Sequence, residues 1–292
     1  MSVAAPTLRT PAEVTHARRP RARVGTIGGV IVVSFALIAI FAGFIAPYRT
    51  TQLAGLPLES PSMHHLLGTN NIGQDVFTQM VSGARVSLAI GLFAGAATVF
   101  LGAIVGTFAG WRGGATDAVL MRITDFVMVV PGLPLLIVLA AYAGTSLMAV
   151  AAVIALTSWP GPARVLRSQT LSLRNRAHLR AAVGFGGGTL HVLRRHILPE
   201  ISLLLAASLV GNAGRAVMME AGLAFLGLGD PLRASWGQVM RDALNFPSLF
   251  DTPVWQWWLV PPIVALVLLL LGLTFVGLAI EARLAPRVAR HV

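Results

Sequence analysis

The sequence of 292 residues contains no cysteine, and all of its 22 basic residues are arginine, so lysine is missing as well. The absence of cysteine excludes disulfides and thiolate metal sites. A phosphate-binding P-loop needs a lysine after its glycines, so an ATP site of that type is also excluded. Charged residues make up only 11% of the chain, against about a quarter in soluble domains. So little charge cannot cover a water-facing surface, and the sequence therefore predicts an integral membrane protein.

Apolar residues and arginine dominate what is present. The chain is 55% hydrophobic with a mean hydropathy of +0.76, and its net charge is +11. A basic excess can indicate nucleic-acid binding, but that function needs a basic face on a soluble domain. Here the arginines lie between apolar stretches. We therefore expect no nucleic-acid partner, and no residue pattern calls for a cofactor.

Long stretches with little or no charge predict the membrane spans. A helix needs about 20 apolar residues to cross the hydrocarbon core. The longest uncharged stretch holds two spans, because Gly144-Thr145-Ser146 divides it into a hairpin. The predicted spans are residues 27–46, 86–110, 120–143, 146–160, 201–229 and 259–280. The expected fold is an all-α polytopic membrane protein with about six transmembrane helices.

The distribution of arginine between the connections predicts the orientation of the chain. Cytoplasmic connections carry an excess of Lys and Arg. With the N-terminus inside, seventeen arginines fall in cytoplasmic segments, four fall outside and Arg215 lies within a span. We expect both termini in the cytoplasm. The predicted parts are a disordered tail (1–23), the first span with an external segment (24–84), a core membrane domain (85–285) with a cytoplasmic loop (161–200), and a second tail (286–292).

The loop 161–200 is the most basic connection and has its own pattern. A short helical segment, residues 177–183, precedes a cluster of glycines that permits a sharp turn. Leu190, Leu193 and Ile197 then recur at helical spacing, opposite two arginines, and Pro199 ends this amphipathic helix. Two interpretations share this pattern: a basic hairpin resting on anionic lipid headgroups, or a docking site for a partner protein.

A longer pattern in the loop separates the two interpretations. Arg180-Ala181-Ala182, then Gly186, then His196-Ile197-Leu198-Pro199 resembles the EAA loop of ABC importer permeases. In that family the loop forms two coupling helices that sit in a groove of the ATPase subunit, and glutamate usually stands where this chain has Arg180. The resemblance implies an ATPase-coupling role for Arg180, Ala181, Ala182, Gly186, His196, Leu198 and Pro199.

The resemblance covers roughly residues 65–240, in order and at the spacing of dipeptide/oligopeptide permeases. Asn70 and Gln74 stand where that family usually has Asp and Arg. The matching segments are His65–Asn70, Gly73–Phe77, Gly83–Leu88, Gly110-Trp111, Asp117, Met121-Arg122, Thr124-Asp125, Pro131, Glu220-Ala221, Phe225–Gly229 and Ser235–Gly237. The order of these segments, with a long first external segment, is similar to the C-type subunit of a two-permease system.

This resemblance implies a type I ABC importer permease fold in a bacterial inner membrane. The chain would form half of a translocation pathway for dipeptides or oligopeptides and catalyse no covalent chemistry. It would pair with a second homologous permease, two ATPase domains and an external substrate-binding protein. Related permeases move nickel, haem or glutathione, so these substrates stay open. An ion-coupled secondary transporter or channel is the alternative from another class, but it predicts buried charge in several spans and often an internal repeat.

Two further groups of residues are candidates for a site. An ionisable residue inside a span costs roughly 3 kcal/mol or more at the membrane centre and usually faces a cavity or a partner. Arg215, Met219 and Glu220 are therefore candidates for the translocation pathway, or they bond to other helices and hold the bundle in register. Arg215 and Glu220 are five residues apart and face different directions. His64-His65 is a possible metal pair, but sequence neighbours rarely point at one ion, so we expect no metal site.

Overall fold

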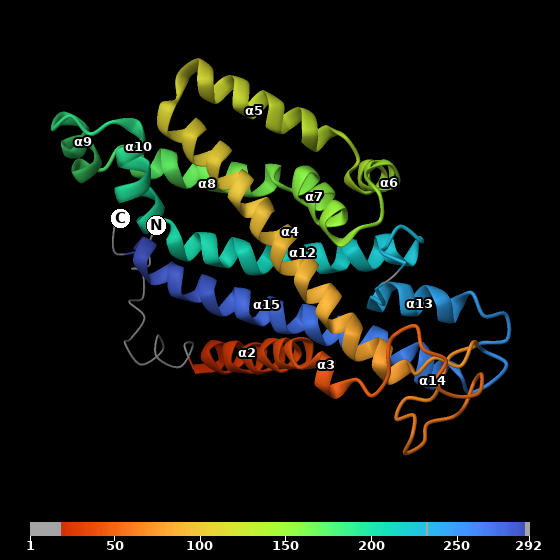
Figure 1. The fold of residues 1–292 in the computed structure, drawn as a ribbon. Coiled ribbons are helices and arrows are strands. Elements are labelled where there is room, and N and C mark those ends of the chain that lie inside the picture. The colour runs from red at the N-terminus through yellow and green to blue at the C-terminus, as the bar shows by residue number, and fades with distance from the viewer. Residues whose placement is uncertain (1–18, 232, 290–292) are drawn as a thin grey trace, which may run out of the picture.

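The regular structure of the described residues is helical and contains no β-strand (Figure 1). The computed structural model describes residues 19–231 and 233–289. Four helices are long and apolar enough to cross a membrane, and two bent pairs of helices have the length of one span each. The four long helices are α2 (Arg19–Ile40), α4 (Val76–Arg112), α12 (Ser202–Phe225) and α15 (Val260–Ala289). Four to six candidate spans in an all-α chain confirm the predicted fold class.

Counted as one span each, the two bent pairs stand third and fourth among six, and the remaining helices are short. The helices of the first pair are α5 (Gly114–Val129) and α6 (Gly132–Ala143), and those of the second are α7 (Leu147–Ser158) and α8 (Pro160–Arg174). The short helices are α3 (Ala42–Ile45), α9 (Ala177–Gly184), α10 (Thr189–Val192), a π-helical turn (Leu193–Ile197), α11 (Leu198–Glu200), α13 (Trp236–Leu244) and α14 (Trp255–Trp258).

Proline determines where both pairs bend. The first pair bends by 87° between Val129 and Gly132. Val130 is extended there (φ −71°, ψ 129°), because the ring of Pro131 disfavours the helical conformation of the residue before it. The second pair bends by 47° at Trp159, directly before Pro160. Proline lacks the N–H that a continuous helix needs, and it is tolerated in a first helical turn.

The second span is longer than the sequence indicated, because α4 begins at Val76 and not near residue 86. Arg85 looked like the end of an external connection. Its guanidinium instead reaches the end of α2, where Nε donates to the carbonyl of Ala39 (3.0 Å) and Nη2 to that of Ile40 (3.2 Å). The last carbonyls of a helix have no partner within it. Arg85 therefore lies on a helix and caps another one.

The predicted loop 161–200 is a connection only in its second half. Residues 160–174 form α8, which continues the fourth span after the bend. We use the name Arg-rich connection for residues 175–200, which link α8 to α12. The predicted tails also shorten: α2 begins at Arg19, inside the tail placed at residues 1–23, and α15 extends to Ala289, inside the tail placed at 286–292. Residues 1–18 and 290–292 lie outside the described residues.

Helix α4 crosses the bundle diagonally and packs against both α8 and α12 (Figure 1). Glycines on α4 make these close approaches possible. A Cβ atom on Gly95 would lie 2.8 Å from the backbone nitrogen of Ala213 in α12, and one on Gly102 would lie 2.7 Å from Cβ of Pro162 in α8. Small residues at helix contacts are typical of membrane bundles, where backbones approach closely.

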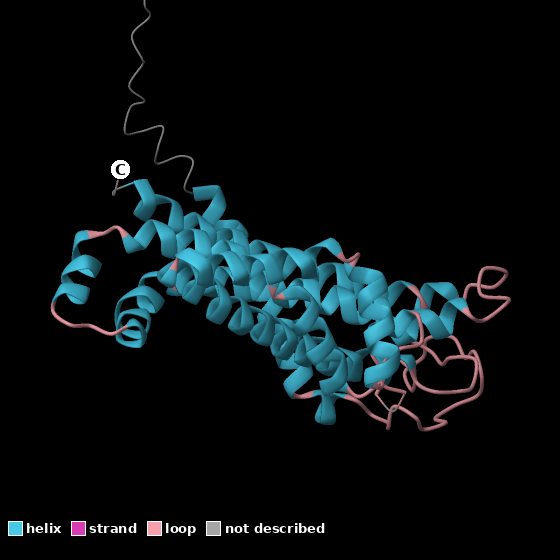
Figure 2. Ribbon diagram, turned by 90° about the horizontal axis from the view of Figure 1, so that it is seen from above, coloured by secondary structure: helices cyan, strands magenta, loops and turns pink. Residues whose placement is uncertain are grey.

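The elongated bundle has two different ends (Figures 1 and 2). One end carries the Arg-rich connection, the first residues of α2 and the last residues of α15. The opposite end carries the cap, by which we mean residues 47–75 together with 236–258. An apolar cluster that includes Val76, Val239, Leu249 and Trp258 holds the cap together. The Arg-rich connection therefore lies at the same end of the bundle as the two ends of the described chain.

Candidate functional site

The Arg-rich connection begins with α9 and turns sharply at its glycines. The backbone of Gly186 has φ +86°, a left-handed conformation that glycine adopts without a side-chain clash. Around this turn the N–H of Phe185 donates to Ala181 (2.9 Å) and that of Gly187 to Ala182 (2.9 Å). These bonds satisfy carbonyls at the end of α9, as is common where a helix ends in a left-handed residue. The structure thus confirms the helix and the glycine turn of the predicted pattern.

The chain returns toward the membrane through α10, the π-helical turn and α11. Pro199 was expected to end this helix, but the helical backbone continues through it to Glu200, and Ile201 separates α11 from α12. Proline cannot donate to the carbonyl four residues earlier, and its ring clashes with that carbonyl in a regular α-helix. The wider turn at Leu193–Ile197 ends two residues before the proline, and such turns often occur at functional sites.

The inner face of the Arg-rich connection packs as a small apolar core. Leu179, Val192 and Ile197 are each 0% exposed. They form one cluster with Leu166 and Leu173 of α8. Leu198 packs at the edge of this cluster. Full burial of such side chains contributes roughly 1.5–3 kcal/mol each, so the connection is a folded element attached to the bundle.

One carboxylate joins the beginning of the connection to its end. Glu200 of α11 accepts a hydrogen bond from Nη1 of Arg176 (3.2 Å), and its other oxygen lies 2.7 Å from Nε2 of His178. Both partners stand at the start of α9. We call these three residues the Glu200 clamp. Because residues 176 and 200 are held together, the segment between them projects as a closed loop.

The outer face of the connection exposes apolar side chains at its tip. Phe185 is 93% exposed and Leu190 is 63% exposed. Of the residues predicted for coupling, Arg180, Ala181, Gly186 and Pro199 are exposed, while Ala182, His196 and Leu198 are half-buried. The ring of His196 packs edge-on against that of His191, with centroids 5.9 Å apart. The predicted residues therefore lie in one folded element, divided between its surface and its core.

Two arginine–aspartate pairs connect α8 to α5. Arg167 binds Asp117 with two parallel hydrogen bonds, from Nε (2.5 Å) and from Nη2 (2.6 Å). Arg164 Nη2 donates to Asp125 at 2.5 Å. Bidentate arginine–carboxylate pairs are directional as well as strong. Helix α8, from which the Arg-rich connection leaves, is thus tied to the third span at two points.

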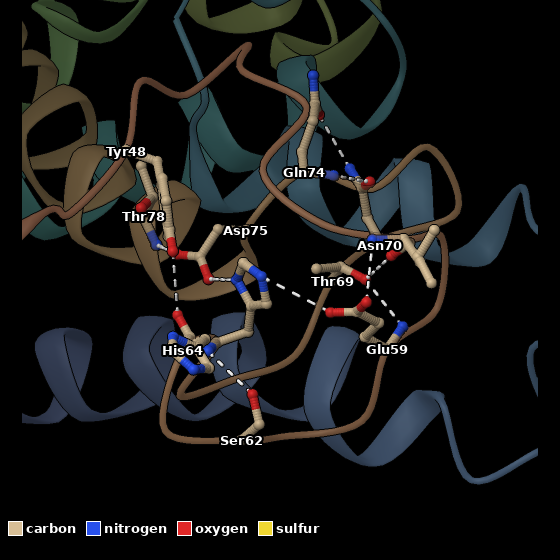
Figure 3. A network of polar contacts seen from close by, with 11 residues as sticks. Tyr48, Glu59, Ser62, His64, Thr69, Asn70, Gln74, Asp75 and Thr78 are labelled. Carbon is tan, nitrogen blue, oxygen red and sulfur yellow. Dashed lines mark hydrogen bonds and ion pairs between the residues drawn. The ribbon is translucent and has the colours of Figure 1, made fainter.

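The cap is built on a buried polar network (Figure 3). Asp75 accepts from the N–H of Thr78 (2.7 Å) at the start of α4, and its other oxygen lies 3.0 Å from Nδ1 of His65. Asn70 donates to Oε1 of Gln74 at 2.9 Å. A neutral pair therefore stands at the two positions where this sequence departs from the pattern that it otherwise resembles.

The two adjacent histidines of the cap point to different surroundings. His65 is 3% exposed, and its Nε2 lies 3.6 Å from Glu59. His64 is exposed, and its backbone carbonyl accepts a 3.4 Å hydrogen bond from the hydroxyl of Tyr48. Within residues 19–231 and 233–289, no group of three or more His, Asp or Glu residues has a geometry that could hold a metal ion.

Helix α12 carries the charged residues predicted inside a span. Arg215 is exposed, whereas Glu220 is 3% exposed and accepts from the hydroxyl of Ser87 at 3.4 Å. Met219 is half-buried, and its sulfur lies 3.7 Å from the hydroxyl oxygen of Ser158. The three residues are close in sequence but face different surroundings: Glu220 bonds to α4, Met219 packs against α7, and Arg215 is exposed with its guanidinium beside Gly161 of α8.

Residues 102–290 match the model of a family described as binding-protein-dependent transport system inner membrane component. The chain belongs to this family. It is similar to a putative peptide permease protein of Brucella suis biovar 1, with 34% identity over 264 residues, which are 89% of this chain and 86% of the relative. It is also similar to the oligopeptide transport system permease protein OppC of Bacillus subtilis, with 32% identity over 271 residues, 92% and 87% of the two chains.

A putative peptide transport system permease protein of Brucella suis biovar 1 is 34% identical over 284 residues, 96% of this permease and 93% of the relative.

Phe185 is a residue of the exposed tip that the sequence analysis did not single out, although the sequence pattern indicates it. It is the one large apolar side chain among the glycines at positions 184 to 188. The glycines set the turn, and the aromatic residue between them is exposed.

Proposed function

We propose that this permease is the membrane subunit of an ATP-driven peptide importer, in which it forms half of the translocation pathway and the ATPase activity resides on partner chains. Its membership of the transport family and the names of its relatives support this function. The proposed location is a bacterial inner membrane with both termini in the cytoplasm, because arginines are concentrated in the connections assigned to that side.

The observation that carries the proposal is the shape of the Arg-rich connection. Its inner face is fixed to α8 by an apolar core, and its ends are joined by the Glu200 clamp. Its tip presents Phe185 and Leu190 to the surroundings. Large apolar side chains that stay exposed on a folded element mark interaction sites. We assign the tip to a groove of the ATPase partner.

The contacts of α8 provide a route from that docking site to the spans. When the ATPase moves the connection, α8 moves with it through their shared apolar core. The pairs Arg167–Asp117 and Arg164–Asp125 then transmit the movement to α5. The 47° bend before Pro160 lets α8 change its angle to α7. ATP binding and hydrolysis would thereby rock several spans together, which opens the pathway to alternate sides.

The pathway itself is assigned to the exposed face of α12. Gly211, Arg215, Met218 and Gly222 are exposed and recur every three or four residues, so they share one face of the helix. A guanidinium that faces lipid near the middle of a span would cost roughly 3 kcal/mol or more. An aqueous path between this permease and a second homologous permease removes that cost. Met219 is half-buried against α7 and Glu220 is buried against α4, so in this conformation neither lies on the exposed face that carries Arg215.

The complete importer would therefore contain a heterodimer of permeases, two ATPase domains and an external substrate-binding protein. Co-purification of this chain with an ATPase, followed by uptake measurements in proteoliposomes, tests the assignment. Peptide uptake should require the ATPase, ATP and the binding protein together. Uptake by the purified chain alone, without nucleotide, would contradict it and favour an ion-coupled transporter.

The substrate requires a separate experiment. Mass spectrometry of the small molecules that co-purify with the binding protein should detect short peptides. If nickel, haem or glutathione is retained instead, the peptide assignment is wrong while the importer assignment stands.

A further inference from the structure

A basic hollow lies between the membrane bundle and the Arg-rich connection. It has a volume of about 370 Å³ and is lined by Trp111, Arg112, Arg174, Leu179, Arg180 and Val183. These residues come from the end of α4, the end of α8 and the middle of α9. We call it the arginine pocket. It is separate from the tip that carries Phe185.

The three arginines of the pocket have no carboxylate partner among the described residues. The nearby acids are already engaged: Glu200 belongs to its clamp and Asp117 is held by Arg167. The guanidinium of Arg112 lies 5.9 Å from the centre of the Phe108 ring, and none of the three forms an ion pair. Like charges that share one hollow repel each other, so an anion bound there would be stabilised by all three.

The rest of the pocket is apolar, and an exposed apolar strip of α4 lies next to it along the helix. Leu179 is buried, Trp111 is half-buried and Val183 is 47% exposed. From Arg112 toward the middle of the span, Phe108 and Ile104 follow at four-residue steps and are 38% and 52% exposed. A ligand that follows this surface would need an anionic head and an apolar chain. Tryptophan and arginine at the end of a span are also typical of the membrane interface.

We propose that the arginine pocket binds the phosphate headgroup of an anionic phospholipid, whose acyl chain lies along Ile104 and Phe108. Arginine recognises phosphate through bidentate hydrogen bonds, and basic pockets between membrane helices bind anionic headgroups. The lipid would connect α4, α8 and α9 beside the docking element. This role also accounts for arginine at position 180, where related permeases usually have glutamate. The proposal does not depend on which substrate the importer carries.

Native mass spectrometry of the purified complex in detergent tests the proposal. After incubation with phosphatidylglycerol or phosphatidylcholine, the complex should retain phosphatidylglycerol in preference. The double variant Arg112→Gln/Arg174→Gln should bind phosphatidylglycerol more weakly than the wild type, by a factor of roughly ten or greater. Arg194→Gln/Arg195→Gln removes two exposed arginines of the same connection that do not line the pocket, and it should bind within twofold of the wild type.

Two further arms identify the ligand. Arg112→Lys/Arg174→Lys keeps the charge but loses the bidentate geometry, so it should bind lipid more weakly than the wild type and more tightly than the double Gln variant, which separates loss of charge from a failure to fold. Inorganic phosphate in millimolar excess should not displace the lipid. The proposal is wrong if both double Gln variants lose lipid equally, if phosphatidylcholine binds as well, or if free phosphate competes fully. It is also wrong if the pocket variant binds lipid normally and loses only the ATPase.

Discussion

The cap and the Arg-rich connection are both stretches of chain outside the long helices, but they hold their conformations in different ways. In the cap, side chains such as His65, Thr69, Asn70 and Asp75 are buried and bond to one another or to the backbone. In the Arg-rich connection the buried groups are apolar, the Glu200 clamp is partly exposed, and Arg180, Arg194 and Arg195 form no ion pair within the described part of the chain. A buried polar network fixes one geometry. An apolar core with an exposed polar rim leaves a surface that a partner can bind.

The largest expected effect on stability is at the cap. Asp75→Ala removes the N-cap of α4, which is worth about 1 kcal/mol, and leaves buried His65 without its partner, which costs about 1–3 kcal/mol more. We expect the thermal unfolding midpoint of the purified complex to fall clearly. Asn71→Ala, at an exposed neighbouring position, is the control and should leave the midpoint unchanged. Equal midpoints for the two variants would show that the cap does not depend on this network.

The glycine turn should give the largest effect on coupling. Gly186→Val places a β-branched residue at φ +86°, at a cost of roughly 1–2 kcal/mol for the left-handed conformation. We expect peptide uptake to fall roughly tenfold while the protein stays in the membrane. Gly188→Val is the matched control, because Gly188 is extended (φ −68°) and has open space around it. Full uptake by Gly186→Val would contradict the assignment of the Arg-rich connection as the docking site for the ATPase.

The Glu200 clamp should give a smaller effect. An ion pair that is about a third exposed contributes only about 0.2–1 kcal/mol. Glu200→Gln should therefore reduce ATP-driven uptake about twofold to fourfold without changing the thermal unfolding midpoint measurably. Glu281→Gln, at an exposed carboxylate of α15, should have no effect on uptake. A lower unfolding midpoint for Glu200→Gln would mean that the clamp stabilises the fold more than it serves coupling.

The sequence predicted the helical class and the helix–glycine–helix pattern because both depend on local composition and spacing. It misplaced the limits of the spans where an arginine has a distant partner. Arg85 caps α2 from 45 residues away, and Arg167 pairs with Asp117 across 50 residues. A charged residue in the sequence indicated the end of a span at these positions. In the folded chain the arginine instead lies on a helix and binds a carbonyl or a carboxylate of a neighbouring helix.

The arginine pocket and the exposed face of α12 could not be predicted for a related reason. Arg112 is about 60 residues from Arg174 and Arg180 in sequence, and the three line one pocket only because the ends of α4 and α8 lie beside α9. Arg215 and Glu220 could be singled out by their charge, but which of them faces outward depends on the packing of α12 against α4. Phe185 was visible in the sequence as the one large apolar residue among the glycines at positions 184 to 188, but its exposure depends on the fold of the connection.

The absence of cysteine allows the central claim, that the tip of the Arg-rich connection docks on the ATPase, to be measured directly. Phe185→Cys and Met63→Cys replace two side chains that are both 93% exposed, one at the tip and one in the cap. Each variant would be labelled with a membrane-permeant maleimide, which also reaches the cap inside the vesicle, in inside-out membrane vesicles before and after the ATPase is stripped off. We predict that the ATPase slows labelling at position 185 at least tenfold, and that it leaves labelling at position 63 unchanged. Equal labelling at position 185 with and without the ATPase would contradict the account.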